Sequence, residues 1–262
     1  MSPDAGCVLL VGAGPGAADL MTVRALRAVE GAQALLYDAL ITEEVLALAP
    51  KGCVRIQTGK RSGKASMDQG EINRLMLRLA RKGLRVVRLK GGDPSVFGRS
   101  GEERAFLEAH GVGVEIVPGV TAASAAAAQF AFPLSHRGEA RRVTFATARV
   151  QDGALVEGGW AGLADAQTTV VLYMARDAAA AAAGRLMAEG RAGDTPALAV
   201  ENAGRSQARA VACTLAQLGD AVADAGFDGP VALIVGEACA QARNVQAYAA
   251  PATASGRLSR AV

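Results

Sequence analysis

The sequence predicts an α/β protein of two domains, the first with a mostly parallel sheet and the second with a mixed sheet. Three observations predict this class. Short apolar runs alternate with amphipathic helical patterns along most of the chain, which is typical of parallel α/β sheets. The 262 residues are enough for two domains, since a domain commonly has about 100–150. Hydrophobic residues make up 51% of the chain, which allows a buried core and excludes a disordered or fibrous protein.

Strands and helices alternate through the first half. Strands are expected over 7–12, 34–38, 53–57, 84–89 and 114–117, and helices over 68–82, 101–109 and 121–129. A further helix should open at Asp19. Its apolar side carries Leu20, Val23, Leu26 and Val29. The helix over 68–82 has the clearest pattern, because apolar residues from Ile72 to Leu79 recur at i, i+3, i+4 and i+7, and Gly83 follows its end.

A polar, basic stretch over 133–142 interrupts this pattern and predicts the domain boundary. Beyond it, strands are expected near 143–147, 169–173, 197–201, 208–213 and 230–235, and helices near 177–189 and 214–224. A short turn around 202–207 joins two of these strands, so the second sheet should be mixed. The predicted domains are 1–135 and 136–240, followed by a poorly ordered tail over 241–262.

The composition argues against several classes of function. The 28 basic and 25 acidic residues give a formal net charge of +3, too small an excess to predict nucleic-acid binding. Four cysteines form no C-x-x-C pair and only two histidines are present, so no metal site is predicted. No apolar run reaches the roughly 20 residues that a membrane-spanning helix needs. We therefore expect a cytoplasmic protein that binds neither nucleic acid nor membrane.

Three turns of small residues follow predicted strands. The first, Gly12-Ala13-Gly14-Pro15-Gly16, resembles a nucleotide-binding turn. Ala17 stands where the dinucleotide fingerprint has its third glycine, and Pro15 has no backbone N–H for a pyrophosphate. This turn alone therefore gives only weak support for NAD binding.

The most informative segment reads RLKGGDPSVFGRSGEE, over 88–103. Gly91 and Gly92 end a strand, where they let the backbone approach a ligand closely, and Asp93 follows with a carboxylate. The third turn runs over 119–124. Asp38 ends the second predicted strand, and in parallel α/β sheets ligands bind beyond the carboxyl ends of the strands. These turns and carboxylates predict one ligand site at that edge.

The motifs now support a specific resemblance. Over 7–238 the chain resembles uroporphyrinogen-III C-methyltransferases, because it contains their motifs in the same order. These motifs are GAGPG, LYD, GKR, EIN, VVRLKGGDPxxFGRxGEE, VPGVTAA, PLSHR, LYM and GPVALIVGE. These enzymes belong to the tetrapyrrole methylases. The resemblance implies two α/β domains with S-adenosylmethionine in the cleft between them, and a homodimer. It also implies methylation of uroporphyrinogen III at positions 2 and 7, giving precorrin-2 by way of precorrin-1, for siroheme, cobalamin or haem d1 synthesis.

The resemblance also implies roles for particular residues. S-adenosylmethionine, and its product S-adenosylhomocysteine, would contact Pro15, Gly91, Gly92, Asp93, Val96, Thr121, Ala122, Met174 and Ala203. Asp38 would be the proton acceptor and Lys60 the proton donor. A carboxylate such as Asp38 suits the acceptor role, because the macrocycle must lose a proton after methylation. The substrate carries eight carboxylates, and the candidates to bind them are Arg61, Lys64, Arg99 and Arg137.

The chain departs from the family pattern at several positions. The departures are Ser62 to Ala65 after GKR, Ala148-Arg149 for G-H, Ala175 for the glycine after Met174, and Ala203 for a glycine after the V-E strand end. Three alternatives therefore stay open: a methyltransferase acting on a later precorrin, an NAD-dependent oxidoreductase, and a binding protein that kept the fold without activity.

Overall fold

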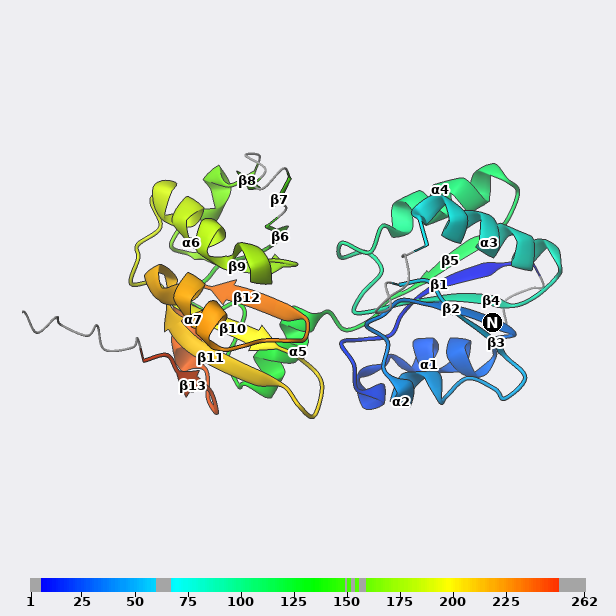
Figure 1. Ribbon diagram of the computed structural model, residues 1–262, viewed down its shortest axis with the longest axis horizontal. Coiled ribbons are helices and arrows are strands. Elements are labelled where there is room, and N and C mark those ends of the chain that lie inside the picture. Colours follow the sequence, from blue (N-terminus) through cyan, green and yellow to red (C-terminus); the bar gives the residue numbers. More distant parts are fainter. Residues whose placement is uncertain (1–5, 60–66, 149, 152–153, 156–158, 250–262) are drawn as a thin grey trace, which may run out of the picture.

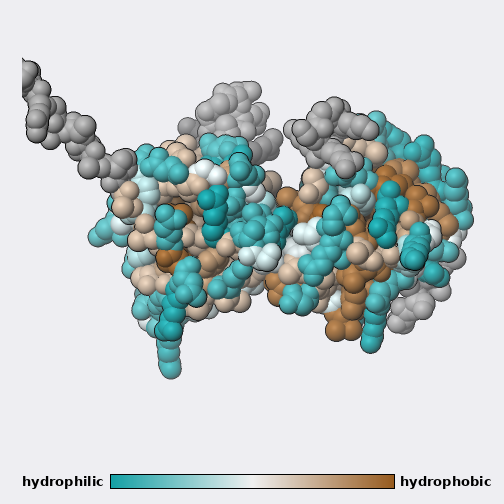
Figure 2. Space-filling view, turned by 60° about the horizontal axis from the view of Figure 1, so that its bottom comes forward, coloured by the Kyte–Doolittle hydropathy of each residue, from teal (hydrophilic) through white to brown (hydrophobic). Residues whose placement is uncertain are grey.

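The computed structural model describes residues 6–59, 67–148, 150–151, 154–155 and 159–249. Two lobes, each with its own sheet, lie side by side (Figure 1). The surface narrows to a waist between them, and brown hydrophobic patches are more prominent on the N-terminal lobe (Figure 2). Within the described residues, none of the helices is both long and apolar enough to cross a membrane.

The N-terminal lobe contains a five-stranded sheet. Its strands are β1 (Val8–Gly12), β2 (Ala34–Tyr37), β3 (Val54–Gln57), β4 (Val86–Lys90) and β5 (Val114–Val117). They are arranged in the order β3-β2-β4-β1-β5, and every pair is parallel. The predicted parallel sheet is confirmed. Because all five strands run the same way, their carboxyl ends lie along one edge, and this edge faces the C-terminal lobe (Figure 1).

Helices cover both faces of this sheet. The helices α1 (Val23–Glu30) and α2 (Glu43–Leu46) lie on one face, and α3 (Gln69–Arg81) and α4 (Ser100–Ala109) lie on the other (Figure 1). The alternation of side chains along each strand produces two cores: Leu9 packs towards α1 and α2, and Leu10 towards α3 and α4. A capping box between Asp68 and Glu71 begins α3 directly before its predicted apolar pattern.

The first helix differs from the expectation. Residues 18–20 form only a 3-10 turn, and α1 begins after Thr22, whose hydroxyl accepts a hydrogen bond from Ala25 N. The buried positions of α1 are Ala25 and Val29, whereas Val23 is 64% exposed. The sequence pattern placed the helix start too early: of the predicted apolar side, Val29 is buried and Leu26 is half-buried, but Val23 is exposed.

The C-terminal lobe contains a six-stranded sheet. Its strands are β6 (Arg142–Thr147), β9 (Thr168–Tyr173), β10 (Pro196–Glu201), β11 (Arg209–Thr214), β12 (Val231–Val235) and β13 (Gln246–Ala247). The order is β13-β11-β10-β12-β9-β6, with parallel pairs at the two edges and antiparallel pairs between them. The predicted mixed sheet is confirmed. A short separate ribbon joins β7 (Val150–Gln151) and β8 (Ala154–Leu155).

The limits of the lobes differ from the predicted domains in two places. The helix α5 (Ala122–Gln129) precedes the expected boundary at 135, but Ala123 and Ala126 pack against Val171 and Leu198 of the second sheet. The chain therefore crosses between the lobes directly after β5 (Figure 1). In the tail that was expected to be poorly ordered, β13 pairs with β11. The opposite face of the sheet is covered by α6 (Ala179–Ala188) and α7 (Leu218–Asp224).

Candidate functional site

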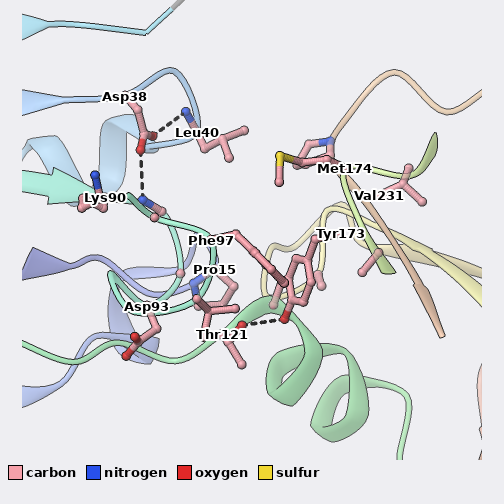
Figure 3. Close-up of a pocket in the computed structure, with 18 of the residues that line it drawn as sticks. Pro15, Asp38, Leu40, Lys90, Asp93, Phe97, Thr121, Tyr173, Met174 and Val231 are labelled. Atoms are coloured by element: carbon pink, nitrogen blue, oxygen red, sulfur yellow. Dashed lines mark hydrogen bonds between the residues drawn. The ribbon is translucent and has the colours of Figure 1, made fainter. Parts of the chain in front are cut away.

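A cavity of about 750 Å³ lies between the two lobes, where the carboxyl ends of the first sheet face the second sheet. Both lobes supply its walls (Figure 3). The predicted site residues that line it are Pro15, Asp38, Gly91, Gly92, Asp93, Val96, Arg99, Thr121, Ala122, Met174 and Ala203. Arg137 does not line the cavity and is exposed in the turn between His136 and Ala140. Lys60, Arg61 and Lys64 lie outside the described residues.

The three glycine turns of the sequence meet at one side of this cavity. Gly14 and Gly92 exchange backbone hydrogen bonds, with N···O distances of 3.2 and 2.7 Å. A Cβ on Gly12 would lie 2.6 Å from Gly119 N, and a Cβ on Gly119 would overlap the Gly92 carbonyl oxygen. Side chains are therefore excluded at Gly12 and Gly119 because backbone meets backbone there. The turns therefore meet through their backbones, and Gly91 and Gly92, directly after β4, present no side chain to the cavity.

Asp93 holds two of these turns together. Its Oδ1 accepts hydrogen bonds from Ser95 N, at 2.7 Å, and from the Ser95 hydroxyl, and its Oδ2 accepts one from Gly119 N at 2.9 Å. Partial burial raises the pKa of this carboxyl, but the hydrogen bonds from Ser95 and Gly119 outweigh it and hold the pKa below its usual value. In Figure 3 the carboxylate points away from Tyr173 and Met174. The Asp93 carboxylate therefore stabilises the loops of Ser95 and Gly119, independently of any contact with a ligand.

Asp38 lies on the wall formed by β2 and β4. Its Oδ1 accepts a hydrogen bond from Leu40 N at 3.0 Å, and its Oδ2 accepts one from Gly91 N at 3.2 Å (Figure 3). These bonds fix the carboxylate in a definite orientation at the cavity wall, beside the glycines that end β4. An oriented carboxylate of this kind can accept a proton from a bound ligand.

Behind Asp38 lies a buried cluster of charges that the sequence analysis missed. Lys90 Nζ lies 2.9 Å from Glu103 Oε2, and Arg88 Nε lies 3.2 Å from Glu103 Oε1. Gln69 Nε2 also donates to Glu103 Oε1, at 3.1 Å. Arg88 and Lys90 are each 5% exposed and Glu103 is fully buried, yet both cations reach the cavity wall. Two basic residues two positions apart in an otherwise apolar strand were the signal that could have identified them.

Burial and the neighbouring charge of Arg88 lower the pKa of Lys90. Glu103 and Asp38 act in the opposite direction, because each carboxylate favours the charged ammonium. Glu103, which also accepts a hydrogen bond from Lys90, has the larger of these two effects on the pKa of Lys90, and Asp38 has the smaller.

Two aromatic side chains, Phe97 and Tyr173, line the cavity, and Phe145 packs against Tyr173 from outside the lining; the sequence analysis named none of them as a site residue. The Tyr173 ring lies 5.6 Å from the Phe97 ring and 5.9 Å from the Phe145 ring, measured between centroids. The Tyr173 hydroxyl meets the Thr121 hydroxyl at 2.6 Å (Figure 3). Burial raises the pKa of Tyr173, so the phenol is neutral and can donate as well as accept.

Strained backbone occurs at the cavity. Of the six non-glycine residues with a positive φ in the described part of the chain, Phe97, Arg99 and Met174 line it, with φ of 53°, 56° and 54°. Residues without glycine's freedom adopt this conformation at a cost of about 1–3 kcal/mol each, and such strain is common at ligand sites. At this position Met174 is 69% exposed and its thioether points into the cleft (Figure 3).

The loop between β10 and β11 closes the cavity against the first glycine turn. Ala17 N donates to the Gly204 carbonyl at 2.9 Å, and Arg205 Nη2 donates to the Leu40 carbonyl at 2.8 Å. A Cβ on Gly204 would overlap the Pro15 ring. The C-terminal lobe is therefore attached directly to the turns that carry Pro15 and Leu40.

The departures from the family pattern occupy different environments. Ala148 and Ala175 are buried in the core beneath α6, where an added methyl group packs without reaching the cavity. Ala203 is buried as well but lines the cavity. Of these three changes, only the one at Ala203 alters the shape of the cavity wall. Arg149 lies outside the described residues.

The remaining polar groups define what the cavity can bind. Arg99 lines it and forms a bidentate pair with Glu102, with N···O distances of 2.9 and 2.6 Å. In the part of the chain that the structure describes, no group of three His, Cys, Asp or Glu side chains is placed to hold a metal ion. The described lining instead offers backbone groups of small residues, aromatic side chains, the oriented carboxylates of Asp38 and Asp93, and several cationic side chains.

Comparison with known proteins shows to which family this architecture belongs. The chain matches the family of tetrapyrrole (corrin/porphyrin) methylases over residues 8–219. It is 47% identical over 233 residues to a siroheme synthase of Chromobacterium violaceum, and the match covers 89% of this chain and 49% of that protein. For a siroheme synthase of Methylococcus capsulatus the identity is 40% over 255 residues, with 97% and 54% covered. The chain thus spans about half the length of the curated relatives it matches.

Solved structures agree with the family match. A uroporphyrin-III C-methyltransferase from Thermus thermophilus, complexed with S-adenosylhomocysteine, is 39% identical with a TM-score of 0.75, and the match covers 88% of this chain and 92% of that one. A cobalt precorrin-4 methyltransferase of cobalamin biosynthesis is 29% identical with a TM-score of 0.81, covering 90% and 96%. Since the family match extends over most of the chain and both lobes, this chain belongs to the tetrapyrrole methylase family.

Proposed function

We propose that this chain uses S-adenosylmethionine to methylate uroporphyrinogen III at positions 2 and 7, giving precorrin-2 by way of precorrin-1. The observation that carries the proposal is the cavity between the lobes, where glycine turns, Asp38 and Met174 converge from distant parts of the chain. The similarity to an enzyme complexed with S-adenosylhomocysteine supports the same assignment.

The cavity suits S-adenosylmethionine in size and lining. Its volume of about 750 Å³ lies within the roughly 300–1,000 Å³ usual for small-molecule sites. Gly91, Gly92, Ala122 and Ala203 have little or no side chain, so their backbone groups are accessible to a nucleoside. S-adenosylmethionine supplies an electrophilic methyl group on a positively charged sulfur. We propose that these residues hold it, together with Pro15, Asp93, Val96, Thr121 and Met174.

The chain's own contribution to the reaction is orientation and proton transfer. A pyrrole carbon must be aligned with the methyl group, and holding the two partners in place supplies much of the rate. Asp38 then accepts the proton that the macrocycle loses, since its carboxylate is oriented by Leu40 N and Gly91 N. We retain Lys60 as the proton donor and Arg61, Lys64, Arg99 and Arg137 as carboxylate-binding candidates; of these, Arg99 lines the described cavity.

Two observations support uroporphyrinogen III as the tetrapyrrole substrate. The chain is 39% identical to the uroporphyrin-III enzyme but 29% identical to the cobalt precorrin-4 enzyme, although the second has the higher TM-score. The complete GGDPxxFGRxGEE segment also favours uroporphyrinogen III over a later precorrin. The matched siroheme synthases are about twice as long as this chain. For the part of them that this chain matches, we propose the methylation, carried out by a homodimer. Family membership gives no support to the NAD-dependent oxidoreductase.

Anaerobic turnover tests the proposal. The purified chain is incubated with uroporphyrinogen III and S-adenosylmethionine, and the products are identified by mass spectrometry. We expect a monomethylated intermediate followed by a dimethylated product. A parallel incubation with a later precorrin should give no methylation. Methylation of the later precorrin alone would overturn the substrate, and failure to bind S-adenosylhomocysteine by calorimetry would overturn the whole assignment.

A further inference from the structure

Lys90 lies on the same cavity wall as the carboxylate that we assign as proton acceptor. The strands β2 and β4 are parallel neighbours with Tyr37 aligned to Leu89, so Asp38 and Lys90 follow directly opposite each other. Aligned residues on neighbouring strands extend to the same face, with backbones about 4.8 Å apart. Both residues line the cavity and are drawn on the same wall in Figure 3.

The balance of charge at this wall includes Asp38. Within the described residues, Arg88 and Lys90 share one buried carboxylate, Glu103, which leaves one positive charge unmatched inside the lobe. A buried charge without a counterion is strongly unfavourable. Asp38 supplies the missing negative charge at the cavity surface, and the field of its carboxylate acts on Lys90. The four groups together are neutral.

We propose that Lys90 is a positioning residue of the methyl-transfer site: fixed by Glu103, its ammonium provides the positive charge beside the Asp38 carboxylate, the group that accepts a proton. This inference rests on the proposed function. It explains why a lysine is buried at the end of β4, where an apolar residue would avoid the loss of hydration. It also explains why Glu103 is fully buried, since the ammonium must be held in place to act on one neighbour.

The charged groups near the ammonium come from two elements, β4 and α4, and from the residue directly after β2. They are Arg88 on β4, Glu102 and Glu103 on α4, and Asp38 after β2. From α3 the contributing group is the neutral amide of Gln69, which bonds to Glu103. Among these carboxylates, Glu103 is fully buried and Glu102 is paired with Arg99, so Asp38 is the one placed to exchange a proton with a ligand.

The pH profile of methyl transfer tests the inference. In Lys90→Met, the pH at which kcat/KM falls to half its plateau on the acid side should rise by about one unit, because a nearby cation commonly favours an ionised carboxylate by about that much or more. Lys90→Arg keeps the charge and should restore most of the wild-type profile. The affinity for S-adenosylhomocysteine should change less than about twofold in both. Lys82→Met, on an exposed lysine, is the matched control and should leave profile and affinity unchanged.

A double variant separates positioning from structural support. Lys90→Met alone leaves two carboxylates, Glu103 and Asp38, with one cation, Arg88. Adding Glu103→Gln leaves one carboxylate, Asp38, with that cation, so the charges of the group are again balanced. The double variant should recover thermal stability but keep the shifted acid limb. A wild-type profile in the stable double variant would overturn the inference and assign Lys90 to structure alone. An inactive wild-type chain would instead overturn the proposed function.

Discussion

The Tyr173 hydroxyl lies 2.6 Å from the hydroxyl of Thr121, a residue 52 positions earlier, and thereby ties β9 to the start of α5. The same phenol oxygen accepts a hydrogen bond from Ala123 N at 3.2 Å. Thr121 is the N-cap residue of α5, but its side chain makes no capping bond. Tyr173 therefore performs the capping from a different strand, at the edge of the cavity.

Tyr173→Phe should lower both stability and ligand affinity. The variant removes the oxygen that satisfies Ala123 N, and loss of a helix cap costs about 1 kcal/mol. Because Thr121 and Ala122 line the cavity, S-adenosylhomocysteine should also bind more weakly, by up to about tenfold, which corresponds to about 1.4 kcal/mol. Denaturant unfolding and calorimetry measure the two effects.

Tyr248→Phe is the matched control for this substitution. The Tyr248 hydroxyl donates to Asp224 at 2.9 Å and lies outside the cavity lining. Its loss should leave the affinity for S-adenosylhomocysteine unchanged. Equal affinity in wild type and Tyr173→Phe would contradict the role of the Tyr173 hydroxyl in shaping the site.

Gly119→Ala should disrupt the meeting point of the three turns. The added Cβ would overlap the Gly92 carbonyl oxygen and lie 2.9 Å from Gly12 Cα, and neither backbone atom can move aside without shifting its strand end. Overpacking of this kind costs about 1–3 kcal/mol. We expect a lower melting temperature and loss of measurable binding of S-adenosylhomocysteine.

Gly101→Ala adds the same methyl group as Gly119→Ala, but it should raise stability rather than lower it. Gly101 lies in α4, where a Cβ would meet no atom within 4 Å. Alanine is favoured over glycine inside helices, so stability should rise by about 0.5–1 kcal/mol. If both variants behaved alike, backbone contact at Gly119 would not be the reason for its glycine.

Most strands were predictable because each is a short run rich in apolar or β-branched residues with a turn at its end. The strand expected over 114–117 matches β5, and the run over 7–12 contains β1. The glycine turns were predictable as well, since a glycine directly after a buried apolar run marks the place where the strand ends and the backbone turns. Which turn contacts which could not be read from the chain, because strand order is set by packing between distant segments.

The parts that were missed depend on tertiary contacts. The alanines of α5 carry no directional pattern, and the helix packs on the second sheet through Ala123 and Ala126. Lys90 resembles a surface charge in the sequence, and only the arrangement of α4 over β4 buries it against Glu103. Tyr173 was part of a recognised motif, yet its hydroxyl has a partner from a segment far away in the chain.

Asp93→Asn should change the dependence of stability on pH. Hydrogen bonds from Ser95 and Gly119 hold the folded pKa of Asp93 below its ordinary value of 3.8, so the unfolded chain takes up this proton more readily. The stabilisation is complete above that ordinary value and declines as the pH falls through the folded pKa. Wild type should therefore exceed the variant by about 1–3 kcal/mol near neutral pH, and the difference should shrink below about pH 4.

Urea unfolding of both proteins between about pH 7 and about pH 3 measures this difference. Asp93 holds loops at the cavity, so weaker loops should also weaken ligand binding. The variant should therefore bind S-adenosylhomocysteine more weakly, in proportion to its loss of stability at neutral pH. A constant difference at every pH would show that the Asp93 charge does not act through Ser95 and Gly119.

Asp38→Asn separates binding from chemistry. Asparagine keeps the size of the side chain and one oxygen acceptor for Leu40 N or Gly91 N, so stability should fall by about 1 kcal/mol or less. Affinity for S-adenosylhomocysteine should stay nearly the same. Methyl transfer should fall by about 10²–10⁴-fold, the usual contribution of general acid–base catalysis, because the amide cannot accept the proton.

Asp19→Asn, on an exposed carboxylate outside the cavity, is the control for Asp38→Asn and should leave turnover unchanged. Anaerobic turnover, calorimetry and melting temperature on the same preparation distinguish the outcomes. Near-normal turnover per folded molecule would leave Asp38 as a support for Leu40 and Gly91, and a substrate carboxylate or water would then accept the proton.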